Sequence, residues 1–304
     1  MVKKGHTMNN NTGYKTFKIF NILFISLMFV VIIFPYLNVL ARAFNEGSDT
    51  SLGGITIYPR VPTLRNFSLL INNDSVIGAA IISISRVVLG TLFALAVQFS
   101  AAYTLTKKRL LGRNFILILL TIPMFFSGGL IPQYILYSRM HLLNSFLIYI
   151  LPFGFSFFNM IVIRTFLYTI PASLEESAKL DGANEVTIFI KVIIPLSLPI
   201  VATISLWMAV FHWNDWVTTL YFVTNSRMHT LQFILMQMIQ ESDRLARLIQ
   251  EDLKKGAVVN QSQYITPDAV RSAQVIITTL PIILVYPFLQ KYFIKGVMIG
   301  SIKE

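Results

Sequence analysis

Six long apolar segments, separated by polar or basic stretches, most constrain how this chain folds. Each is at least as long as the about 17–25 residues that a helix needs to cross the hydrocarbon core of a bilayer. Inside lipid, backbone amides and carbonyls must find partners within the protein, and a helix provides them within one segment. The sequence therefore predicts an all-α polytopic membrane protein with six transmembrane helices, over residues 18–42, 76–104, 114–137, 143–167, 194–221 and 270–292.

The composition agrees with a location in lipid. Of the 304 residues, 55% are hydrophobic and 13% are charged, whereas a soluble domain carries about 25% charged residues. The net charge of +11 comes from basic residues beside the apolar segments. That pattern is typical of topology anchors and contact with anionic lipid rather than of nucleic-acid binding. The chain contains no cysteine, which excludes disulfides and thiolate metal sites.

Basic residues also predict the orientation. They crowd three stretches, which are Lys3–Lys18, Lys107–Arg113 and Lys291–Lys303. The positive-inside rule makes all three cytoplasmic, so both termini and the loop 168–195 are expected in the cytoplasm. The loops 43–75 and 222–269 are then external. The first apolar segment exceeds the about 7–15 residues of a signal-peptide core, which indicates an uncleaved transmembrane helix.

The third apolar segment is interrupted by helix-breaking residues. Pro123, Gly128, Gly129 and Pro132 all lie within it. A broken helix is tolerated at membrane depth only where protein or a water-filled cavity satisfies the freed backbone groups. We therefore expect this segment to face the interior of the helical bundle.

The cytoplasmic loop predicts two short helices joined by a glycine turn. Ser173 and Glu176 fit a capping box, so a helix is expected to begin at Ser173 and to end near Leu180. Gly182 follows as the left-handed residue just past that end. Asn184 fits the N-cap position of a second helix. From the residues alone, an interfacial amphipathic connector between two spans is an open alternative.

Three elements of this loop resemble the EAA coupling loop of ABC importer permeases. They are Glu176–Ala178 (with Ser177 in place of the first alanine), Gly182, and the segment Val192–Pro195. Further segments are similar to the carbohydrate-uptake, maltose-type branch, namely Asp181–Ala183, Trp213–Trp216 and Gln290–Lys303. Within that branch the chain resembles the second permease of complex-oligosaccharide importers.

The resemblance implies a permease subunit that forms half of the membrane pathway for a sugar or oligosaccharide, acidic ones included. The implied setting is a bacterial plasma membrane. The implied partners are a second homologous permease, a cytoplasmic ABC ATPase dimer that holds ATP and Mg, and an extracellular solute-binding protein that meets the external loops. The residues implied in coupling to the ATPase are Glu175, Glu176, Ala178, Asp181, Gly182, Ala183 and Pro195.

Arg86 lies near the middle of the second predicted span, where a charge is expensive and indicates function. Three interpretations are open. Arg86 pairs with Asp215 or with a helix carbonyl as part of the structure, or it faces the pathway and meets an anionic group of the solute, such as a uronate carboxylate. In the third interpretation, the second span has other boundaries than those predicted, or the Arg86 side chain snorkels to the membrane interface.

Aromatic and polar residues near the outer end of the fifth span are candidates for solute contact. Trp213, Asn214 and Asp215 lie there, and Asn159 lies among phenylalanines of the fourth span. Aromatic faces suit sugar rings, and polar groups suit hydroxyls. The alternative is an interfacial aromatic belt. The resemblance to the maltose-type branch also implies that the partner permease can make much of the solute contact.

Other functional classes fit the sequence less well. The four histidines are scattered, and the chain has neither a His-Glu-x-x-His motif nor a Gly-x-Ser-x-Gly motif. It also lacks the Gly-x-x-x-x-Gly-Lys-Ser/Thr phosphate loop, so no enzyme activity and no cofactor bound by this chain are expected. The main rival is an ion-coupled secondary transporter, which would place coupling charges at mid-membrane.

Overall fold

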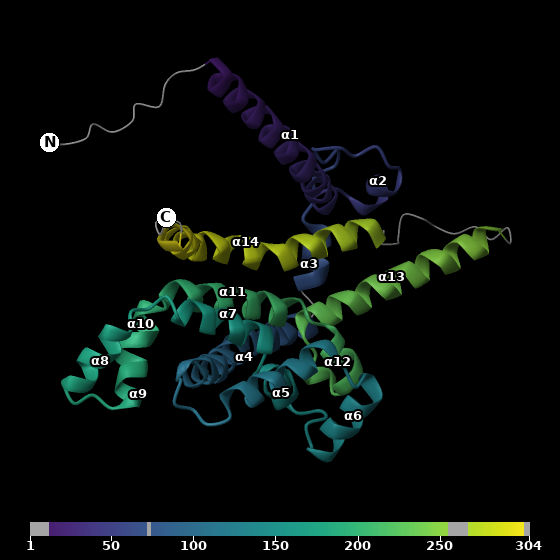
Figure 1. Cartoon of the computed structure of the whole chain (residues 1–304). Helices are drawn as coiled ribbons and strands as arrows, with labels where there is room; N and C mark the ends of the chain where they lie inside the picture. Colours follow the sequence, from purple (N-terminus) through teal and green to yellow (C-terminus); the bar gives the residue numbers. More distant parts are fainter. Residues whose placement is uncertain (1–11, 72–73, 255–266, 301–304) are drawn as a thin grey trace. The chain divides into compact units, whose positions relative to one another are not determined.

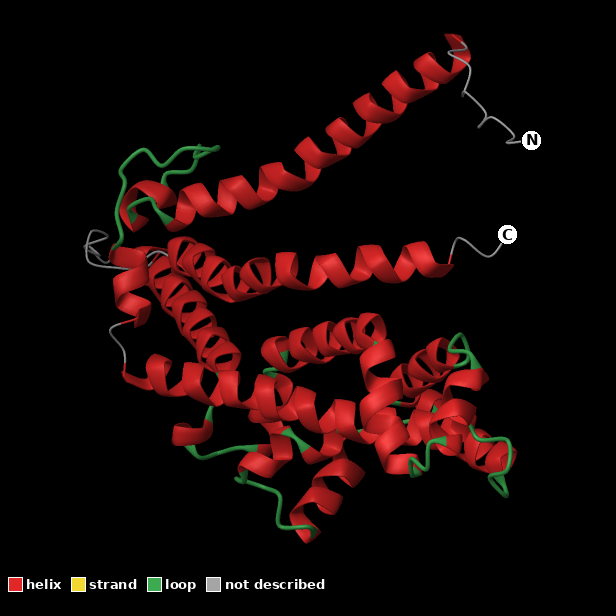
Figure 2. Ribbon diagram, turned by 90° about the vertical axis from the view of Figure 1, so that its left-hand side faces the viewer, coloured by secondary structure: helices red, strands yellow, loops and turns green. Residues whose placement is uncertain are grey.

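A computed structural model describes residues 12–71, 74–254 and 267–300 of the chain. Every named secondary-structure element in these ranges is a helix (Figures 1 and 2), and Asn45 and Pro62 form an isolated antiparallel bridge. The loops 43–75 and 222–269, which are expected to be external, and the end of the chain lie partly outside the described residues. The α-helices before the loop 168–195 are α1 Thr12–Ala43, α2 Gly47–Ser51, α3 Arg65–Ile71, α4 Asp74–Thr106, α5 Arg113–Phe125, α6 Leu130–Arg139 and α7 Phe157–Leu167.

The α-helices from that loop onward are α8 Ala172–Leu180, α9 Glu185–Ile188, α10 Ile194–Leu196, α11 Leu198–Asn214, α12 Val217–Phe222, α13 Leu231–Lys254 and α14 Pro267–Gly300. Three short 3₁₀ helices and one π-helix complete the described elements: η1 Phe146–Tyr149, η2 Leu151–Phe153, η4 Ser226–Met228 and the π-helix η3 Phe189–Ile193.

Three of these helices are long and apolar enough to cross a membrane alone, which are α1, α4 and α14. Three pairs pass the same test only when their two parts are taken together. These are α5 with α6, the segment 146–153 with α7, and the segment 185–196 with α11, bent by 117°, 51° and 81°. Counting each bent pair as one span gives six, and the predicted all-α polytopic membrane fold is confirmed.

The third span is broken as predicted, and it meets the rest of the chain along one face: Ile116, Leu117 and Leu120 of α5 pack against the core, and Tyr134 and Tyr137 of α6 contact Phe222. The helix stops at Phe125, and Gly129 takes a φ of 82°, a left-handed value that glycine adopts without strain. Neither α5 nor α6 contains a buried residue. The other faces of both half-helices are exposed in this chain, and the sequence does not tell whether lipid or a second protein covers them.

Contacts divide the chain into two units, and each is described by itself. The first contains Met1–Leu69 and Ser242–Ile276. In it, the chain after α1 is held by side-chain hydrogen bonds to the backbone. The amide nitrogen Nδ2 of Asn66 donates to the carbonyl oxygens of Ala43, at 2.9 Å, and of Asn45, at 2.8 Å.

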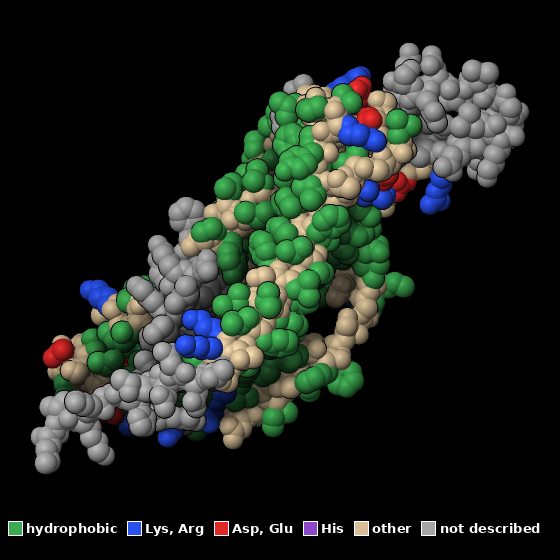
Figure 3. Space-filling view, turned by 90° about the horizontal axis from the view of Figure 1, so that it is seen from above, with side chains coloured by type: hydrophobic (Ala, Val, Ile, Leu, Met, Phe, Trp, Pro, Cys, Tyr) green, Lys and Arg blue, Asp and Glu red, His purple; other side chains and the backbone are tan. Residues whose placement is uncertain are grey.

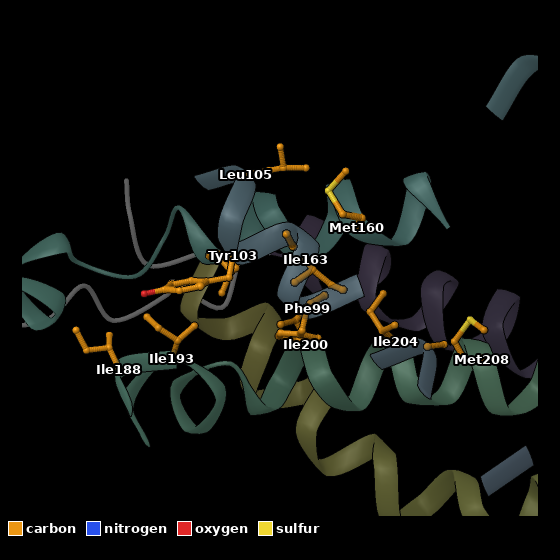
Figure 4. Close-up of a cluster of buried hydrophobic side chains, with 13 residues drawn as sticks. Phe99, Tyr103, Leu105, Met160, Ile163, Ile188, Ile193, Ile200, Ile204 and Met208 are labelled. Atoms are coloured by element: carbon orange, nitrogen blue, oxygen red, sulfur yellow. The ribbon is translucent and has the colours of Figure 1, made fainter. Parts of the chain in front are cut away.

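The second unit contains Leu70–Glu241 and Ile277–Glu304, and α4 lies at its core. This helix packs against α7 and α11. Ala94 and Ala102 of α4 are fully buried, and small residues let helices approach closely. Larger side chains, among them Phe99 of α4, Ile163 of α7 and Ile204 of α11, form the buried hydrophobic cluster between the three helices (Figure 4).

Much of the described surface is apolar. Phenylalanines, leucines and isoleucines along α1 are exposed, as are those on the outer sides of α4, α5 and α6. Hydrophobic side chains dominate the face in Figure 3, and charged side chains form only a few groups there. Exposed apolar area of this extent marks contact with a membrane or with another protein.

Candidate functional site

The loop 168–195, which is expected in the cytoplasm, folds into α8, a glycine turn and α9. Gly182, just past the end of α8, has a φ of 82°. The amide of Ala183 donates to the carbonyl oxygen of Ala178 at 2.9 Å, and the amide of Gly182 donates to that of Lys179 at 3.0 Å. These two bonds form a Schellman motif, so the predicted left-handed conformation of Gly182 is confirmed.

The sequence predicted the start of α9 correctly and the start of α8 incorrectly. Asn184 caps α9 as predicted, since its Oδ1 accepts from the amide of Thr187 at 2.8 Å. The capping box at Ser173 is wrong. The N-cap residue is Pro171, and α8 begins at Ala172, so Ser173 already lies inside the first turn and is not at the cap.

Beyond α9 the helix widens before it enters the membrane segment. Pro195 lacks the amide hydrogen that an α-helix uses at this position, and the π-helix η3 lies directly before α10. A bend of 81° at Ser197 then leads into α11. The loop is therefore a separate, sharply angled element and not a straight extension of the fifth span.

A cluster of five side chains joins this loop to the end of α4. Lys107 forms an ion pair with Glu175 of α8 and lies 3.5 Å from a carboxylate oxygen of Glu185 of α9. The Lys107 Nζ donates to the hydroxyl of Tyr103 at 2.7 Å, and that hydroxyl donates to Glu185 at 3.0 Å. Lys179 pairs with the other oxygen of Glu185 at 2.6 Å. The hydrogen bond from Lys179 is the largest influence that holds the pKa of Glu185 below its usual value.

The predicted coupling residues divide into two groups. Ala178 and Ala183 pack against the hydrophobic core of the second unit, and Glu175 turns toward α4. The other four, which are Glu176, Asp181, Gly182 and Pro195, are exposed. The sequence missed the contribution of Lys107, because a cation in a basic stretch also has a simpler explanation as a topology anchor.

Inside the membrane segments, Arg86 and Asp215 form an ion pair. The Arg86 side chain is 0% exposed, and its Nη1 also donates to the main-chain oxygen of Asp215 at 2.8 Å. Its guanidinium lies 4.8 Å from the centroid of the Tyr149 ring. Oδ1 of Asp215 accepts from the amide of Val217 at 3.0 Å, at the start of α12. Of the three interpretations of Arg86, the structure shows the pairing with Asp215.

Further polar side chains beside this pair were not predicted from the sequence. The hydroxyl of Tyr149 lies 2.9 Å from that of Thr219, which in turn lies 3.0 Å from that of Thr230. Ser83 of α4 accepts from the amide of Leu231 at 2.8 Å. Single threonines and serines carry no spacing signal, so nothing in the sequence indicated this network.

Asn159 lines a cavity of about 300 Å³. The cavity is largely aromatic, and its lining residues are Pro152, Phe153, Phe155, Ser156, Asn159, Trp207, Met208 and Phe211. Trp213 and Asn214 do not line it. The Trp213 indole donates to the carbonyl oxygen of Thr278 at 2.9 Å, and the Asn214 side chain donates to that of Val210 at 2.9 Å. The structure thus brings Arg86 and Asp215 together; neither lines the Asn159 cavity, but the Arg86 guanidinium lies 5.7 Å from the ring centroid of Phe153, which does.

Residues 86–299 match the sequence profile of the family described as "Binding-protein-dependent transport system inner membrane component". The chain belongs to this family. The match includes Arg86, the Asn159 cavity and the whole loop 168–195, so these features lie within the part of the chain that carries the family signature.

Individual family relatives match over nearly the full chain. Protein LplC of Bacillus subtilis is 36% identical over 98% of this chain and 98% of its own length. The polygalacturonan/rhamnogalacturonan transport system permease protein YtcP of Bacillus subtilis is 33% identical over 91% of this chain and 95% of its own length. A solved chain from a bacterial ABC transporter involved in the import of the acidic polysaccharide alginate has a TM-score of 0.80 at 24% identity, covering 94% of this chain and 100% of that chain.

These similarities decide between the two transporter classes. The chain is a permease subunit of an ABC importer, and the comparisons do not support the ion-coupled alternative. Within the described residues, no group of three or more histidines or carboxylates could hold a metal ion.

Proposed function

We propose that this chain forms one half of the membrane pathway of an ATP-driven saccharide importer and receives the force of ATP hydrolysis through α8. The observation that carries the proposal is the two-sided geometry of the cytoplasmic loop. One side of α8 is joined to the core through Ala178 and Glu175, and the other presents Glu176 and Asp181 outward.

The exposed side is suited to contact with a separate ATPase. In this proposal Glu176 and Asp181 contact the ATPase, and Gly182 fixes the turn between α8 and α9. Ala178 and Ala183 tie the turn to the core, Glu175 anchors it to α4, and Pro195 sets the angle at which the loop enters α11. ATP and Mg are bound by the partner, and this chain binds no cofactor.

The proposed assembly contains a second, homologous permease, an ABC ATPase dimer and an extracellular solute-binding protein. The exposed apolar helices of this chain meet the second permease and membrane lipid. The loops 43–75 and 222–269 face the outside of a bacterial plasma membrane and meet the binding protein, while both termini lie in the cytoplasm. This orientation is supported by the basic residues of the cytoplasmic stretches.

The proposed solute is an oligosaccharide, acidic ones included. Support comes from the solute named for YtcP and from the aromatic cavity, in which Asn159 and Ser156 offer polar groups beside the Trp207 ring. Arg86 has a different place in the proposal, because its charge is already matched by Asp215. The pair stabilises the wall of the pathway, and Trp213 and Asn214 continue that wall.

The experiment that tests the proposal is purification of the tagged full-length protein from its native membrane in mild detergent. Mass spectrometry of the co-purifying proteins should find a second permease and an ABC ATPase. Any solute-binding protein that follows can be screened against neutral and uronate-containing oligosaccharides by calorimetry. A homo-oligomer without an ATPase, under conditions that preserve a known ABC importer, would contradict the proposal.

A further inference from the structure

We infer that Lys107 is a positioning residue for coupling, because it fastens the cytoplasmic loop to α4. The inference rests on the proposed function of α8 as the element that receives force. It concerns a residue that lies outside the loop, in the turn directly after α4 ends at Thr106.

The first argument is the number of elements that meet at one amine. The Nζ of Lys107 contacts Glu175 of α8 and Glu185 of α9, and it donates to Tyr103 of α4. The side chains of Lys107 and Glu175 are only 28% and 25% exposed. Water therefore screens this ion pair less than it screens a pair on an open surface.

The second argument is that the partners of Lys107 are themselves held in place. Tyr103 is buried, and its ring packs against the ring of Phe189, with the two centroids 5.1 Å apart. The ammonium of Lys107 lies 3.9 Å from the centroid of the Tyr103 ring. Lys179 of α8 pairs with Glu185 of α9 across the glycine turn. The two loop helices are thus fastened to each other as well as to α4.

The third argument is where α4 leads. The same helix packs against α7 and α11 and carries Arg86, which is paired with Asp215 at the end of α11. A force on α8 is therefore transmitted to α4 directly through the ion pair between Glu175 and Lys107. The second connection is the polypeptide chain itself, which continues from α9 through η3 and Pro195 into α11. Without Lys107, the ion pair that joins α8 to the end of α4 is lost, and, among the described residues, the remaining polar link from α4 to the loop is the hydrogen bond from Tyr103 to Glu185 of α9.

The neighbouring Lys108 provides a matched control. It is a cation in the same basic stretch, is exposed, and forms no ion pair with the described residues. Replacing it removes the same charge from the same side of the membrane. A difference between Lys107→Met and Lys108→Met therefore reports the contacts of Lys107 and not the effect of charge on topology.

The test uses the intact importer complex in proteoliposomes. A mixture of labelled galacturonan oligosaccharides is the transport probe, and ATP hydrolysis is measured in parallel. We expect Lys107→Met to raise the number of ATP molecules consumed per solute transported by about fivefold or more. About fivefold is the lower end of the effects that coupling between two sites typically produces. Lys107→Arg and Lys108→Met should keep the wild-type ratio.

A second readout does not depend on the solute. The chain has no cysteine, so Leu180→Cys, at a position that is 89% exposed on α8, accepts a single spin label. Lys107→Met should increase the mobility of this label, and Lys108→Met should not. An unchanged ATP-to-solute ratio in Lys107→Met, with or without a change in mobility, would overturn the inference.

The control outcomes separate the inference from the proposed function. A wild-type complex without an ATPase would contradict the proposed function itself, whereas a coupled wild type with a coupled Lys107→Met variant contradicts only the inference. If Lys107→Met loses the ATPase during purification, the double variant Lys107→Glu with Glu175→Lys decides. Recovery of coupling by the reversed pair supports the inference, and failure to recover overturns it.

Discussion

At the scale of single residues, the charge of Arg86 inside an apolar helix is compensated by one carboxylate, that of Asp215. Arg86 and Asp215 lie 129 positions apart in the sequence, yet their side chains form one ion pair. Asp215 also accepts hydrogen bonds from the start of α12, whereas Nε of Arg86 is buried without a hydrogen-bond partner among the described residues. Removal of one member of a buried pair leaves the other charge without compensation, which costs about 3–5 kcal/mol.

We therefore expect Arg86→Gln to lower the melting temperature of the purified complex in detergent. The uptake of neutral and of acidic oligosaccharides should fall by the same factor, because the lost partner is Asp215 and not the solute. Arg139→Gln, at an exposed position at the end of α6, is the control and should leave both quantities unchanged. A selective loss of acidic solutes would instead assign Arg86 to solute recognition.

Gly90 is a second residue whose importance comes from a close approach. A Cβ atom built at this position would lie 2.6 Å from Nε2 of the buried His212. Gly90→Ala should therefore push α4 away from α11 and destabilise the protein by about 1–3 kcal/mol. Gly78→Ala is the matched control on the same helix, since its Cβ meets nothing within 4 Å. Equal thermal stability of the two variants would contradict this packing.

Gly182 tests backbone conformation separately from steric space. Nothing lies within 4 Å of a Cβ at this position, but its φ of 82° disfavours branched side chains. Gly182→Val should cost about 1–2 kcal/mol in the turn and reduce uptake while the protein still inserts in the membrane. Asparagine tolerates this conformation, so Gly182→Asn should transport nearly normally. Normal uptake by the valine variant would refute the role of the turn.

At the scale of elements, the sequence predicted local features of the loop better than its tertiary contacts. The sequence predicted the two loop helices, the turn at Gly182 and the cap at Asn184, because each depends on residues a few positions apart. It placed the start of α8 at the wrong residue, and it missed the ion pairs of Lys107. Those pairs join segments far apart in the sequence, and no local pattern reports them.

The carboxylate of Glu185 makes the contact between α8 and α9 sensitive to acid. Its pKa is held below the ordinary value of 4.5, chiefly by the hydrogen bond from Lys179. A lowered pKa stabilises the folded loop above the unfolded pKa, and that stability is lost as the pH falls through the folded pKa. A spin label at Leu180→Cys should therefore keep its mobility from pH 7 to about pH 5 and become more mobile below pH 4.5. Glu185→Gln should show high mobility at every pH, and a pH profile identical to wild type would contradict this role.

For the whole molecule, the six apolar segments were sufficient to predict an all-α membrane protein. They did not predict that α5 and α6 would meet the rest of the chain along only one face and contain no fully buried residue. Hydropathy reports that a face is apolar, but lipid, a second permease and the chain's own core are all apolar surroundings. The location of Asn159 in a cavity and the separation of Trp213 from it were likewise beyond the sequence, because both depend on how distant helices pack.

The orientation of the molecule can be tested with the same cysteine-free background. Tyr58→Cys, 80% exposed in the loop 43–75, should react with a membrane-impermeant maleimide in intact cells. Leu180→Cys should react only after the cells are permeabilised, because the loop 168–195 is expected in the cytoplasm. Mass-tag gel shifts measure both reactions. Labelling of Leu180→Cys in intact cells would reverse the proposed orientation.

The long sequence separation of Arg86 and Asp215 also bears on how the protein is made. At a synthesis rate of about 5–20 residues per second, Arg86 is made roughly 6 to 26 seconds before its carboxylate partner. During that interval the insertion machinery has to release, or retain, a segment with an unmatched arginine, at a cost of about 2.5–3.5 kcal/mol. Nascent chains that stop before Asp215 would therefore carry an orphan charge in the bilayer, which is a mark that membrane quality-control proteases can recognise.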